Sequence, residues 1–351
     1  MQRPTRNPSK LKIWRFLDGR PGHENQVKGL CEGIARVRPA EMFDLAIDRE
    51  FSGLKSLWPG RLSSLKKLPK PDLLIGAGHS THLPLLACRR RFGGRSVVIM
   101  KPSLPAVLFD LCLIPAHDRL FFRAGNILRT EGSLNCIRPA ENLDSSRGLI
   151  LLGGPSRHFL WSEARVLDQV HSLVMQDSKC WTVMTSARTP PSFVEKWRSV
   201  LPQLPLTVWD SAAPERLPEQ LAKCGVVWVT CDSISMIYEA LTAGSRVGIL
   251  ELPAAAQDRI VSHIRYLTDT SRVTSWTRWS KGAELPEQRA FFSEADRCSV
   301  AVLQHCLVRE SQCSGLTKLF RTVTLQPIAD TLPSLPEEKD CLLHATPGFT
   351  T

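Results

Sequence analysis

Several apolar runs in this chain are followed at once by histidine, acidic or small polar residues, where a bound ligand could reach them. The first such stretch is Asp18-Gly-Arg-Pro-Gly-His23-Glu24-Asn25-Gln26, which follows the run LKIWRFL. Its glycines permit a tight turn and a close backbone approach. Because the ordinary pKa of an imidazole lies near neutrality, we expect His23 to act as a general base. Asp18 or Glu24 would fix its tautomer; the alternative is a surface histidine in a glycine-rich turn.

Two further histidine-bearing stretches lie in the first half of the chain. In the segment 76–82, GAGHSTH, the glycines suit a phosphate or a sugar, but helix capping by Ser80 or Thr81 is the favoured interpretation. No third metal ligand accompanies the two histidines of this segment, so no metal site is expected. His117 and Asp118 follow the apolar run 111–114 and are the next candidates for the catalytic base, with Asp118 able to orient His117 or to cap.

Three apolar runs in the second half also end in polar turns, at 153–158, 185–189 and 230–235. Glycine, serine and arginine together suit a phosphate group, because a guanidinium offers a fork of hydrogen-bond donors. The candidate contacts in the first two turns are Gly154, Ser156, Arg157, Ser186 and Arg188. The third turn precedes an expected helix, whose N-terminus attracts anions and which Thr230, Asp232 or Ser233 could cap.

The alternation of apolar runs with amphipathic segments predicts the elements that position these residues. Strands are expected over 11–17, 72–77, 96–100, 111–114, 147–152, 180–184, 207–209, 226–229 and 247–250. A helix is expected after the strand 72–77, ending at about Arg91. Further helices are expected over 26–36, 161–175, 191–200, 218–222, 234–244, 258–269 and 287–309. Short strands that alternate with helices predict an α/β protein with parallel sheets.

The length of 351 residues favours two domains over one. The polar, proline-bearing stretch 138–147 predicts the boundary, with domains over 11–140 and 148–310. The apolar pattern decays after about residue 311, so the tail 311–351 is expected to be poorly ordered.

The net charge of +11 favours an anionic partner: a sugar nucleotide, a phospholipid surface or a nucleic acid. No nucleic-acid-binding signature accompanies the basic clusters, so a nucleic-acid partner is not expected. The 11 cysteines form no paired spacing, which predicts reduced thiols and disfavours zinc. We find no secretory signal and no apolar run near the roughly 20 residues of a membrane span. The expected location is the cytoplasm, with peripheral contact at the inner membrane as a further expectation.

The stretch from Asp232 to Gly244, with the pattern D-S-x-S-M-x-x-E-A-x-x-x-G, resembles the nucleotide-sugar site of GT-B glycosyltransferases. With DGRPGHENQ, GAG, FDLCLIPAHD, NILRTEGSLN, LLGGPSRH and TSARTP, it makes the chain similar, over roughly residues 11–255, to the family of the plant mitochondrial-fission factor and its bacterial relatives. That resemblance implies two Rossmann-like domains with parallel sheets facing a cleft. It places the donor diphosphate at Gly154, Ser156, Asp232, Ser233 and Ser235, the ribose at Glu239, and the acceptor and base at the loop from Asp18 to His23.

The resulting expectation is a glycosyltransferase that moves a sugar from a nucleoside-diphosphate sugar to a saccharide or lipid-linked acceptor of the cell envelope. No cofactor or metal is expected besides this donor substrate. The alternative is a non-catalytic adaptor that recruits a protein at a membrane surface, as the resemblance to the plant member implies. A third, weaker interpretation is a sugar-nucleotide epimerase. His79 departs from the arginine usual in relatives, and the tail has no recognisable counterpart.

Overall fold

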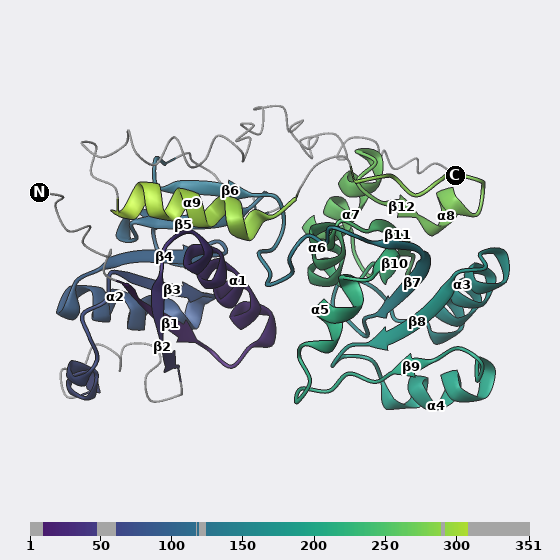
Figure 1. Ribbon diagram of the computed structural model, residues 1–351, viewed down its shortest axis with the longest axis horizontal. Helices are drawn as coiled ribbons and strands as arrows, with labels where there is room; N and C mark the ends of the chain where they lie inside the picture. Colours follow the sequence, from purple (N-terminus) through teal and green to yellow (C-terminus); the bar gives the residue numbers. More distant parts are fainter. Residues whose placement is uncertain (1–9, 48–60, 117, 119–123, 289–291, 308–351) are drawn as a thin grey trace, which may run out of the picture. The chain divides into compact units, whose positions relative to one another are not determined.

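The computed structural model describes residues 10–47, 61–116, 118, 124–288 and 292–307. Its strands form two six-stranded sheets, in the orders β2-β1-β3-β4-β5-β6 and β12-β11-β10-β7-β8-β9 (Figure 1). Every strand pair within the two sheets is parallel. The predicted α/β class with parallel sheets is therefore confirmed.

The first sheet consists of β1 (Leu11–Leu17), β2 (Ala40–Ala46), β3 (Leu73–Ala77), β4 (Arg95–Ile99), β5 (Leu111–Pro115) and β6 (Ile127–Thr130). Its helices are α1 (Pro21–Val37) and α2 (His82–Phe92), with the short 3-10 helices η2 (Arg61–Lys67), η3 (His79–Thr81) and η4 (Ala106–Leu108). Alternate β1 side chains enter two separate cores: Leu11 and Ile13 pack with α1, whereas Trp14 and Phe16 pack with α2. Both faces of this sheet are thus covered, which explains its nearly continuous apolar strands.

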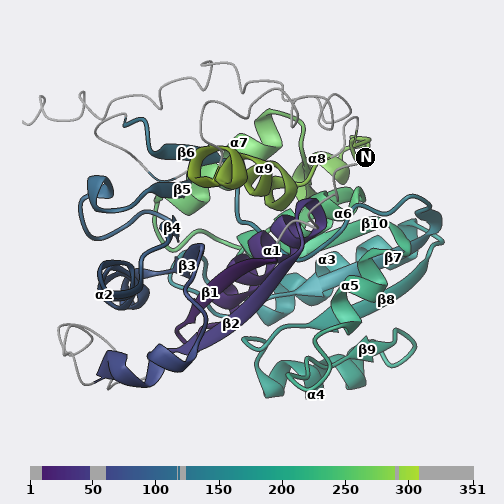
Figure 2. The same cartoon turned by 60° about the vertical axis from the view of Figure 1, so that its left-hand side comes forward.

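The second sheet consists of β7 (Asp144–Leu152), β8 (Cys180–Thr185), β9 (Leu206–Thr207), β10 (Cys224–Thr230), β11 (Arg246–Leu250) and β12 (Thr274–Ser275). Its helices are α3 (Glu163–Gln176), α4 (Pro191–Val200), α5 (Arg216–Leu221), α6 (Ile234–Ala243), α7 (Arg259–Asp269) and α8 (Trp276–Trp279). Figure 2 shows β10, β7, β8 and β9 side by side, as the strand order requires. The three polar turns predicted from the sequence therefore follow adjacent strands.

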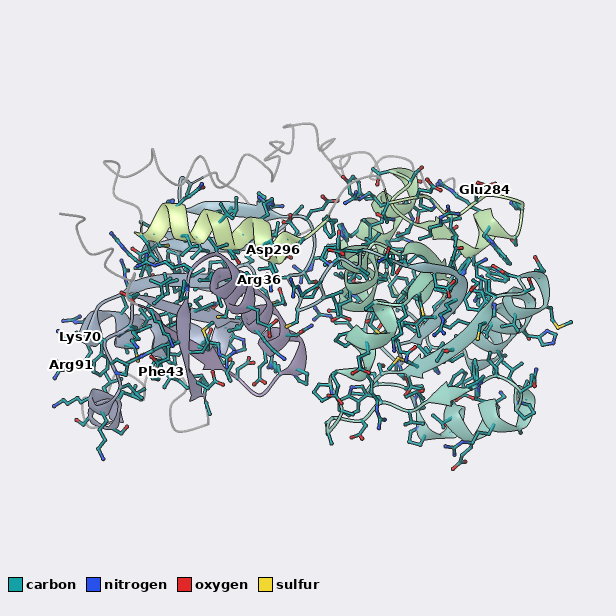
Figure 3. All side chains as sticks on the ribbon, viewed as in Figure 1. Arg36, Phe43, Lys70, Arg91, Glu284 and Asp296 are labelled. Atoms are coloured by element: carbon teal, nitrogen blue, oxygen red, sulfur yellow. The ribbon has the colours of Figure 1, made fainter. Side chains whose placement is uncertain are left out.

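The last described helix, α9 (Glu294–Leu307), packs on the first sheet although it follows the second in sequence (Figure 1). Cys298, Val302 and Leu303 enter the same core as β1 and β3. An ion pair joins Arg36 of α1 to Asp296 of α9 at 2.5 Å (Figure 3). Residues 294–307 fall within the predicted second domain, and the proposed domain boundaries stay a prediction.

Several element boundaries differ from the sequence-based ones. Helix α1 begins at Pro21, not near residue 26, because proline has the helical φ and needs no amide partner at the first position. His23, Glu24 and Asn25 are therefore helical residues. The edge strands β2 and β6 were not predicted, since their half-exposed residues form no buried apolar run. The predicted strand 207–209 is only Leu206–Thr207.

The predicted disorder of the tail 311–351 and the predicted role of His117 concern residues that lie outside the described part of the chain. In the described part of the chain, no helix is long and apolar enough to cross a membrane. The cysteines that the structure describes are all free, and most are buried.

Candidate functional site

At the carboxyl edge of the first sheet, His23 forms a hydrogen bond with Asp18. Asp18 lies in the turn after β1 and His23 lies in the first turn of α1, and His23 Nδ1 is 2.9 Å from Asp18 Oδ2. Ser80 Oγ donates to the same carboxylate oxygen at 2.9 Å. Burial acts to raise the pKa of Asp18, but the hydrogen bonds from His23 and Ser80 outweigh it and hold that pKa below its usual value. An ionised Asp18 favours the tautomer with the proton on Nδ1, so Nε2 is the nitrogen that can accept a proton.

The structure separates the two acidic candidates that the sequence left open. Glu24 Oε1 instead accepts a hydrogen bond from the backbone N–H of Gly19 at 2.9 Å, which closes the turn. Gly78 leaves room for the imidazole: its φ is +82°, and a Cβ there would lie 2.5 Å from the His23 ring. The second glycine of the GAG segment is therefore a packing requirement of the His23 site.

The favoured capping role of Ser80 and Thr81 is wrong. The N-termini of η3 and α2 have no side-chain cap hydrogen bond. Ser80 binds Asp18, and Thr81 Oγ1 donates to the carbonyl of Gly78 at 2.8 Å. His82 faces inward, with Nδ1 3.1 Å from Ser103 Oγ, and burial together with His79 lowers its pKa to about 4. Among the described residues, no cluster of three His, Cys, Asp or Glu could hold a metal.

On the second sheet, Asp232 ties the three polar turns together. Its carboxylate Oδ2 accepts from the backbone N–H of Gly154 at 3.0 Å and from the Arg188 guanidinium at 2.7 Å. Thr230 Oγ1 accepts from the N–H of Gly153 at 2.8 Å, which fastens the same loop. The Asp232 side chain is fully buried, and its Oδ1 has no hydrogen-bond partner in the described part of the chain. Asp232 is thus an anchor of the turns, not a cap.

The N-terminus of α6 is left without a side-chain cap among the described residues. Ser233 occupies the cap position but makes no cap hydrogen bond, and Thr230 and Asp232 are engaged by the β7 loop. The first N–H groups of this ten-residue helix therefore keep their capacity to bind an anion. Ser235 follows in the first turn of the same helix.

The serines of the other two turns partly bind their own loops. Ser156 Oγ accepts from the N–H groups of His158 and Phe159, at 3.3 and 3.1 Å. Ser186 Oγ donates to the carbonyl of Gly153 at 3.1 Å. Arg157 is exposed beside these groups and donates from Nε to His158 Nε2 at 3.1 Å. The predicted phosphate residues thus gather at one sheet edge, although their contact with a phosphate stays a prediction.

Glu239 joins the two sheets. It is buried in α6, and Asn25 of α1 donates from Nδ2 to Glu239 Oε1 at 2.8 Å. Burial raises the pKa of Glu239 to about 7, against the lowering effect of the Asn25 hydrogen bond. Asn25 lies two residues after His23 on α1, so this bond links the helix that carries the predicted base to the helix that carries the predicted ribose residue. The sequence motif contained Asn25, but nothing local indicated its distant partner.

Asp118, the other described candidate for the base, forms an ion pair with Arg259 of α7. Its carboxylate is buried, and Arg129 donates to its backbone carbonyl at 2.8 Å. This pairing ties the end of β5 to the second sheet. A catalytic role of Asp118 stays a prediction, as does that of His117.

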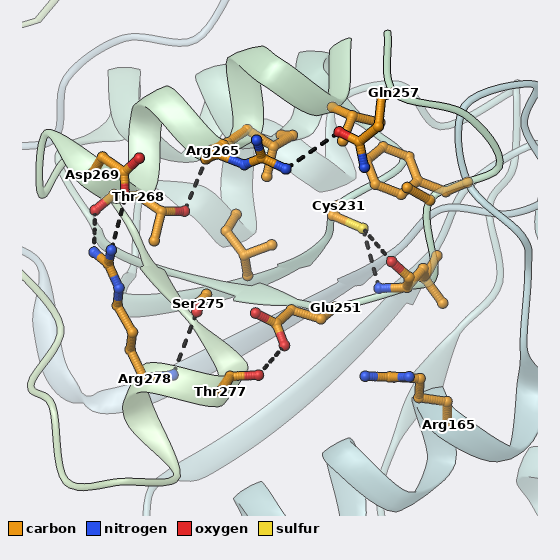
Figure 4. Close-up of a pocket in the computed structure, with 16 residues that line it drawn as sticks. Arg165, Cys231, Glu251, Gln257, Arg265, Thr268, Asp269, Ser275, Thr277 and Arg278 are labelled. Atoms are coloured by element: carbon orange, nitrogen blue, oxygen red, sulfur yellow. Dashed lines mark hydrogen bonds and ion pairs between the residues drawn. The ribbon is translucent and has the colours of Figure 1, made fainter. Parts of the chain in front are cut away.

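One pocket of about 480 Å³ lies on the second sheet, against α7 and α8 (Figure 4). Apolar side chains such as Leu252 and Ile264 line it together with Arg165, Glu251 and Arg265. None of the predicted site residues contributes to its wall. The predicted site residues that the structure describes therefore lie outside this pocket.

Two parallel sheets with polar turns at their carboxyl edges, joined through Asn25 and Glu239, define a GT-B type of α/β fold. The chain belongs to the mitochondrial fission ELM1 family, whose sequence model matches residues 21–306. A comparison with curated proteins found no sequence match.

Solved structures confirm the fold. A protein from Listeria monocytogenes assigned to the UDP-N-acetylglucosamine 2-epimerases is 14% identical, with a TM-score of 0.51 over 85% of this chain and 97% of that one. The UDP-GlcNAc 2-epimerase of Neisseria meningitidis bound to UDP-GlcNAc is 11% identical, with a TM-score of 0.50 over 85% of this chain and 100% of that one. Likeness at such low identity shows the fold alone.

Proposed function

We propose that the protein is a glycosyltransferase that moves a sugar from a nucleoside-diphosphate sugar to a hydroxyl group of a cell-envelope acceptor. The observation that carries this proposal is the pairing of His23 with Asp18 beside the Asn25–Glu239 contact. It supplies a base with a fixed tautomer on α1, the helix that contacts α6, and the N-terminus of α6 has no side-chain cap in the described part of the chain. The UDP-GlcNAc bound by the Neisseria structure of the same fold supports a UDP-sugar as the donor class.

The donor would be held mainly by the second sheet. The diphosphate is assigned to the N-terminus of α6 with Ser233 and Ser235, and to the β7 loop with Gly154, Ser156 and Arg157. Arg188 and Ser186 complete this edge, and Asp232 keeps the turns in register through its bonds to Arg188 and Gly154. Backbone N–H groups and a helix dipole can stabilise the leaving diphosphate without a metal. Glu239 would accept hydrogen bonds from ribose hydroxyls once Asn25 moves aside.

In the transfer step, His23 Nε2 removes the proton of the acceptor hydroxyl while that oxygen attacks the anomeric carbon. The bond from this carbon to the diphosphate breaks, and its electron pair leaves with the phosphate oxygen. Asp18 stabilises the imidazolium that forms, and it keeps its own negative charge because its pKa is low.

The first test is donor binding, by thermal shift and calorimetry with UDP-, GDP-, ADP- and CMP-sugars. We expect one nucleotide class to bind. At about pH 8, above the pKa of Glu239, Glu239→Gln should weaken that binding by about 1.5–3 kcal/mol, because it removes charge-assisted hydrogen bonds to the ribose. Unchanged affinity in that variant would remove Glu239 from the ribose site. If the wild-type protein binds none of the four classes, the glycosyltransferase proposal fails.

A second candidate function is a non-catalytic adaptor at a membrane, and a specific surface favours membrane contact. The amino edge of the first sheet gathers exposed basic residues with an exposed apolar turn. This amino-edge surface consists of Lys66, Lys67, Lys70, Arg90, Arg91, Arg95, Val107 and Leu108. Val107 is 82% exposed. The backbone N–H of Arg95 donates to Asp72 at 2.9 Å, and Arg89 donates to the carbonyl of Leu108 at 2.8 Å, which holds these segments together.

Lys70 and Arg91 both lie where strands of the first sheet begin (Figure 3). Cations beside exposed apolar side chains suit an anionic lipid surface. This surface lies at the opposite sheet edge from His23, so it is compatible with either candidate function. Release of free nucleoside diphosphate in the presence of an acceptor separates an enzyme from an adaptor. It also separates sugar transfer from epimerisation, which returns the sugar nucleotide intact.

A further inference from the structure

His158 forms a second histidine–carboxylate pair, in the loop that follows β7. Its Nδ1 is hydrogen-bonded to Asp258 Oδ2. Asp258 is itself fixed, because its Oδ1 accepts from the N–H groups of Ile260 at 2.8 Å and Val261 at 3.1 Å at the start of α7. The backbone carbonyl of His158 accepts from Ala255 at 2.9 Å. The ring is therefore oriented by Asp258, and the backbone of His158 is fixed by Ala255.

This arrangement repeats that of the first sheet. His23 follows β1, the first strand of its sheet, and His158 follows β7, the first strand of the other. Each imidazole binds an aspartate through Nδ1. Each keeps a modest exposed fraction, 17% for either side chain. Because Nδ1 is engaged, Nε2 is the nitrogen of each ring that can meet a substrate.

The surroundings of His158 Nε2 favour an anion. This nitrogen accepts from Arg157 Nε at 3.1 Å, in the same loop as Gly154 and Ser156. When the imidazole gains a second proton, His158 Nε2 becomes a hydrogen-bond donor. The N–H groups of His158 Nε2 and Arg157 Nε then face each other and cannot bind one another. Both can then turn to one anionic oxygen, a change that the neutral ring cannot support.

The carboxylate of Asp258 would compensate the charge of the imidazolium. Burial acts to raise the pKa of Asp258, but the hydrogen bonds from His158, Val261 and Ile260 outweigh it and hold that pKa below its usual value. In the described part of the chain, the charged groups bonded to the ring are Arg157 from its own loop and Asp258 at the cap position of α7; Arg188 and Asp232 bind the same loop at Gly154.

We propose that His158, positioned by Asp258, donates a hydrogen bond from Nε2 to the leaving diphosphate, together with Arg157. This inference rests on the proposed glycosyl transfer. The bond between the anomeric carbon and the phosphate oxygen breaks, and its electron pair stays on the diphosphate. The acceptor proton goes to His23, and His158 keeps its own proton. The two histidines thus have opposite tasks, one as the base and the other as a hydrogen-bond donor.

The test is calorimetry with inorganic pyrophosphate and with UDP, at about pH 6 and about pH 8, on either side of the ordinary histidine pKa. The wild-type protein should bind both probes on the order of tenfold more tightly at the lower pH than His158→Gln does, and the gap should close at the higher pH. His171→Gln, a change of an exposed histidine on α3, is the matched control and should follow the wild type. The titration of the probe itself is the same for all three proteins.

Proton NMR of the imidazole should show that pyrophosphate shifts the ring-proton resonances of His158 and that Asp258→Asn reduces this shift. A thermal melt verifies that each variant folds. If His158→Gln retains the wild-type pH dependence, or if the wild type binds no pyrophosphate, the inference is wrong and the pair is a structural clamp. His158-dependent binding of pyrophosphate without binding of any sugar nucleotide would refute the proposed function and retain the anion site. Sugar-nucleotide binding that is equally tight in the wild type and in His158→Gln would refute the anion site and retain the proposed function.

Discussion

At the residue scale, the candidate chemistry depends on how single side chains are partnered. The sequence left open whether Asp18 or Glu24 orients His23, and the partner decides which ring nitrogen is free to accept a proton. With Glu24 bound to Gly19, only Asp18 fixes the ring, and Ser80 in turn fixes Asp18. A base supported in this way has one tautomer available, which is the property that general-base catalysis requires.

His23→Ala should therefore lower turnover by about 10²–10⁴, the contribution of a positioned base. Donor affinity should change little, because the donor is assigned to the other sheet. Asp18→Asn is the companion variant and should lower turnover while leaving the ring in place. Steady-state kinetics with calorimetric donor affinities measures both. Full transfer activity in His23→Ala would move the base to another residue, with His117 or Asp118 next.

Glu239 gives a pH-dependent stability that can be measured without knowing the substrate. Its pKa rises from 4.5 to about 7 in the folded protein. Between these values the unfolded chain has lost the proton that the folded chain retains, so stability should fall as the pH rises through this window and level off above it. The difference amounts to about 3 kcal/mol at roughly 1.4 kcal/mol per pKa unit.

Urea unfolding of the wild type and Glu239→Gln, from about pH 4.5 to about pH 8, tests this expectation. The variant has no carboxyl group to titrate, so its stability should lack this part of the decline. Since other groups titrate in both proteins, the difference between the two curves is the measured quantity. Parallel curves would mean that Glu239 is ionised in the folded state at lower pH than its burial indicates.

At the element scale, the position of α9 on the first sheet depends on close contact with α1. A Cβ at Gly33 of α1 would lie 2.2 Å from Ser299 Oγ and 2.9 Å from the backbone carbonyl of Ala295, both on α9. The helix pair therefore needs a residue without a side chain at this position. Gly22, on the same helix, has nothing within 4 Å of the corresponding point.

Gly33→Ala should lower the free energy of unfolding by about 1–3 kcal/mol, because α9 must shift or strain to accept the methyl group. Gly22→Ala is the matched control and should be neutral or stabilising by up to about 1 kcal/mol, as alanine favours the helix. Denaturant titration compares the two. Equal stability of both variants would show that α9 is not held against α1 as the structure describes.

At the scale of the whole molecule, basic side chains and the candidate catalytic residues lie at different edges of the first sheet. The amino-edge surface concentrates basic side chains beside Val107 and Leu108, whereas the catalytic candidates occupy the carboxyl edges. This separation suits a protein that transfers sugar to a lipid-linked acceptor or recruits a partner at a membrane, because binding of the amino-edge surface to the membrane would leave the His23 site accessible.

We expect the full chain to co-sediment with vesicles of mixed neutral and anionic phospholipid, and less so at higher salt. Arg90→Glu with Arg91→Glu should weaken this binding by about tenfold or more, at roughly 1 kcal/mol per basic residue near the surface. Arg198→Glu with Lys223→Glu changes the net charge equally at exposed positions of the second sheet and is the control. Equal losses in both pairs would indicate a general charge effect, and no binding by the wild type would remove the membrane from the proposal.

Local residue pattern was enough to predict the α/β class and most of the strands and helices, but not the half-exposed edge strands β2 and β6. Runs such as LLIGA and VVWV are strands because short apolar stretches rich in β-branched or bulky aliphatic residues fit a parallel strand that is covered on both faces. The polar turns after these runs were also visible in the sequence, because glycine, serine and histidine interrupt the apolar pattern. Local pattern also sufficed for α6, with Gly244 in the left-handed conformation at its end.

Which of these residues meet follows from the strand order and from the packing of the helices. The strand order makes β10, β7 and β8 neighbours and so lets Asp232 hold Gly154 and Arg188. Asn25 and Glu239 stand 214 positions apart in sequence, and the pair of His158 with Asp258 likewise depends on where α7 begins. Side-chain pairing across such distances is set by topology and by desolvation of the groups brought together, and neither leaves a trace in local residue spacing.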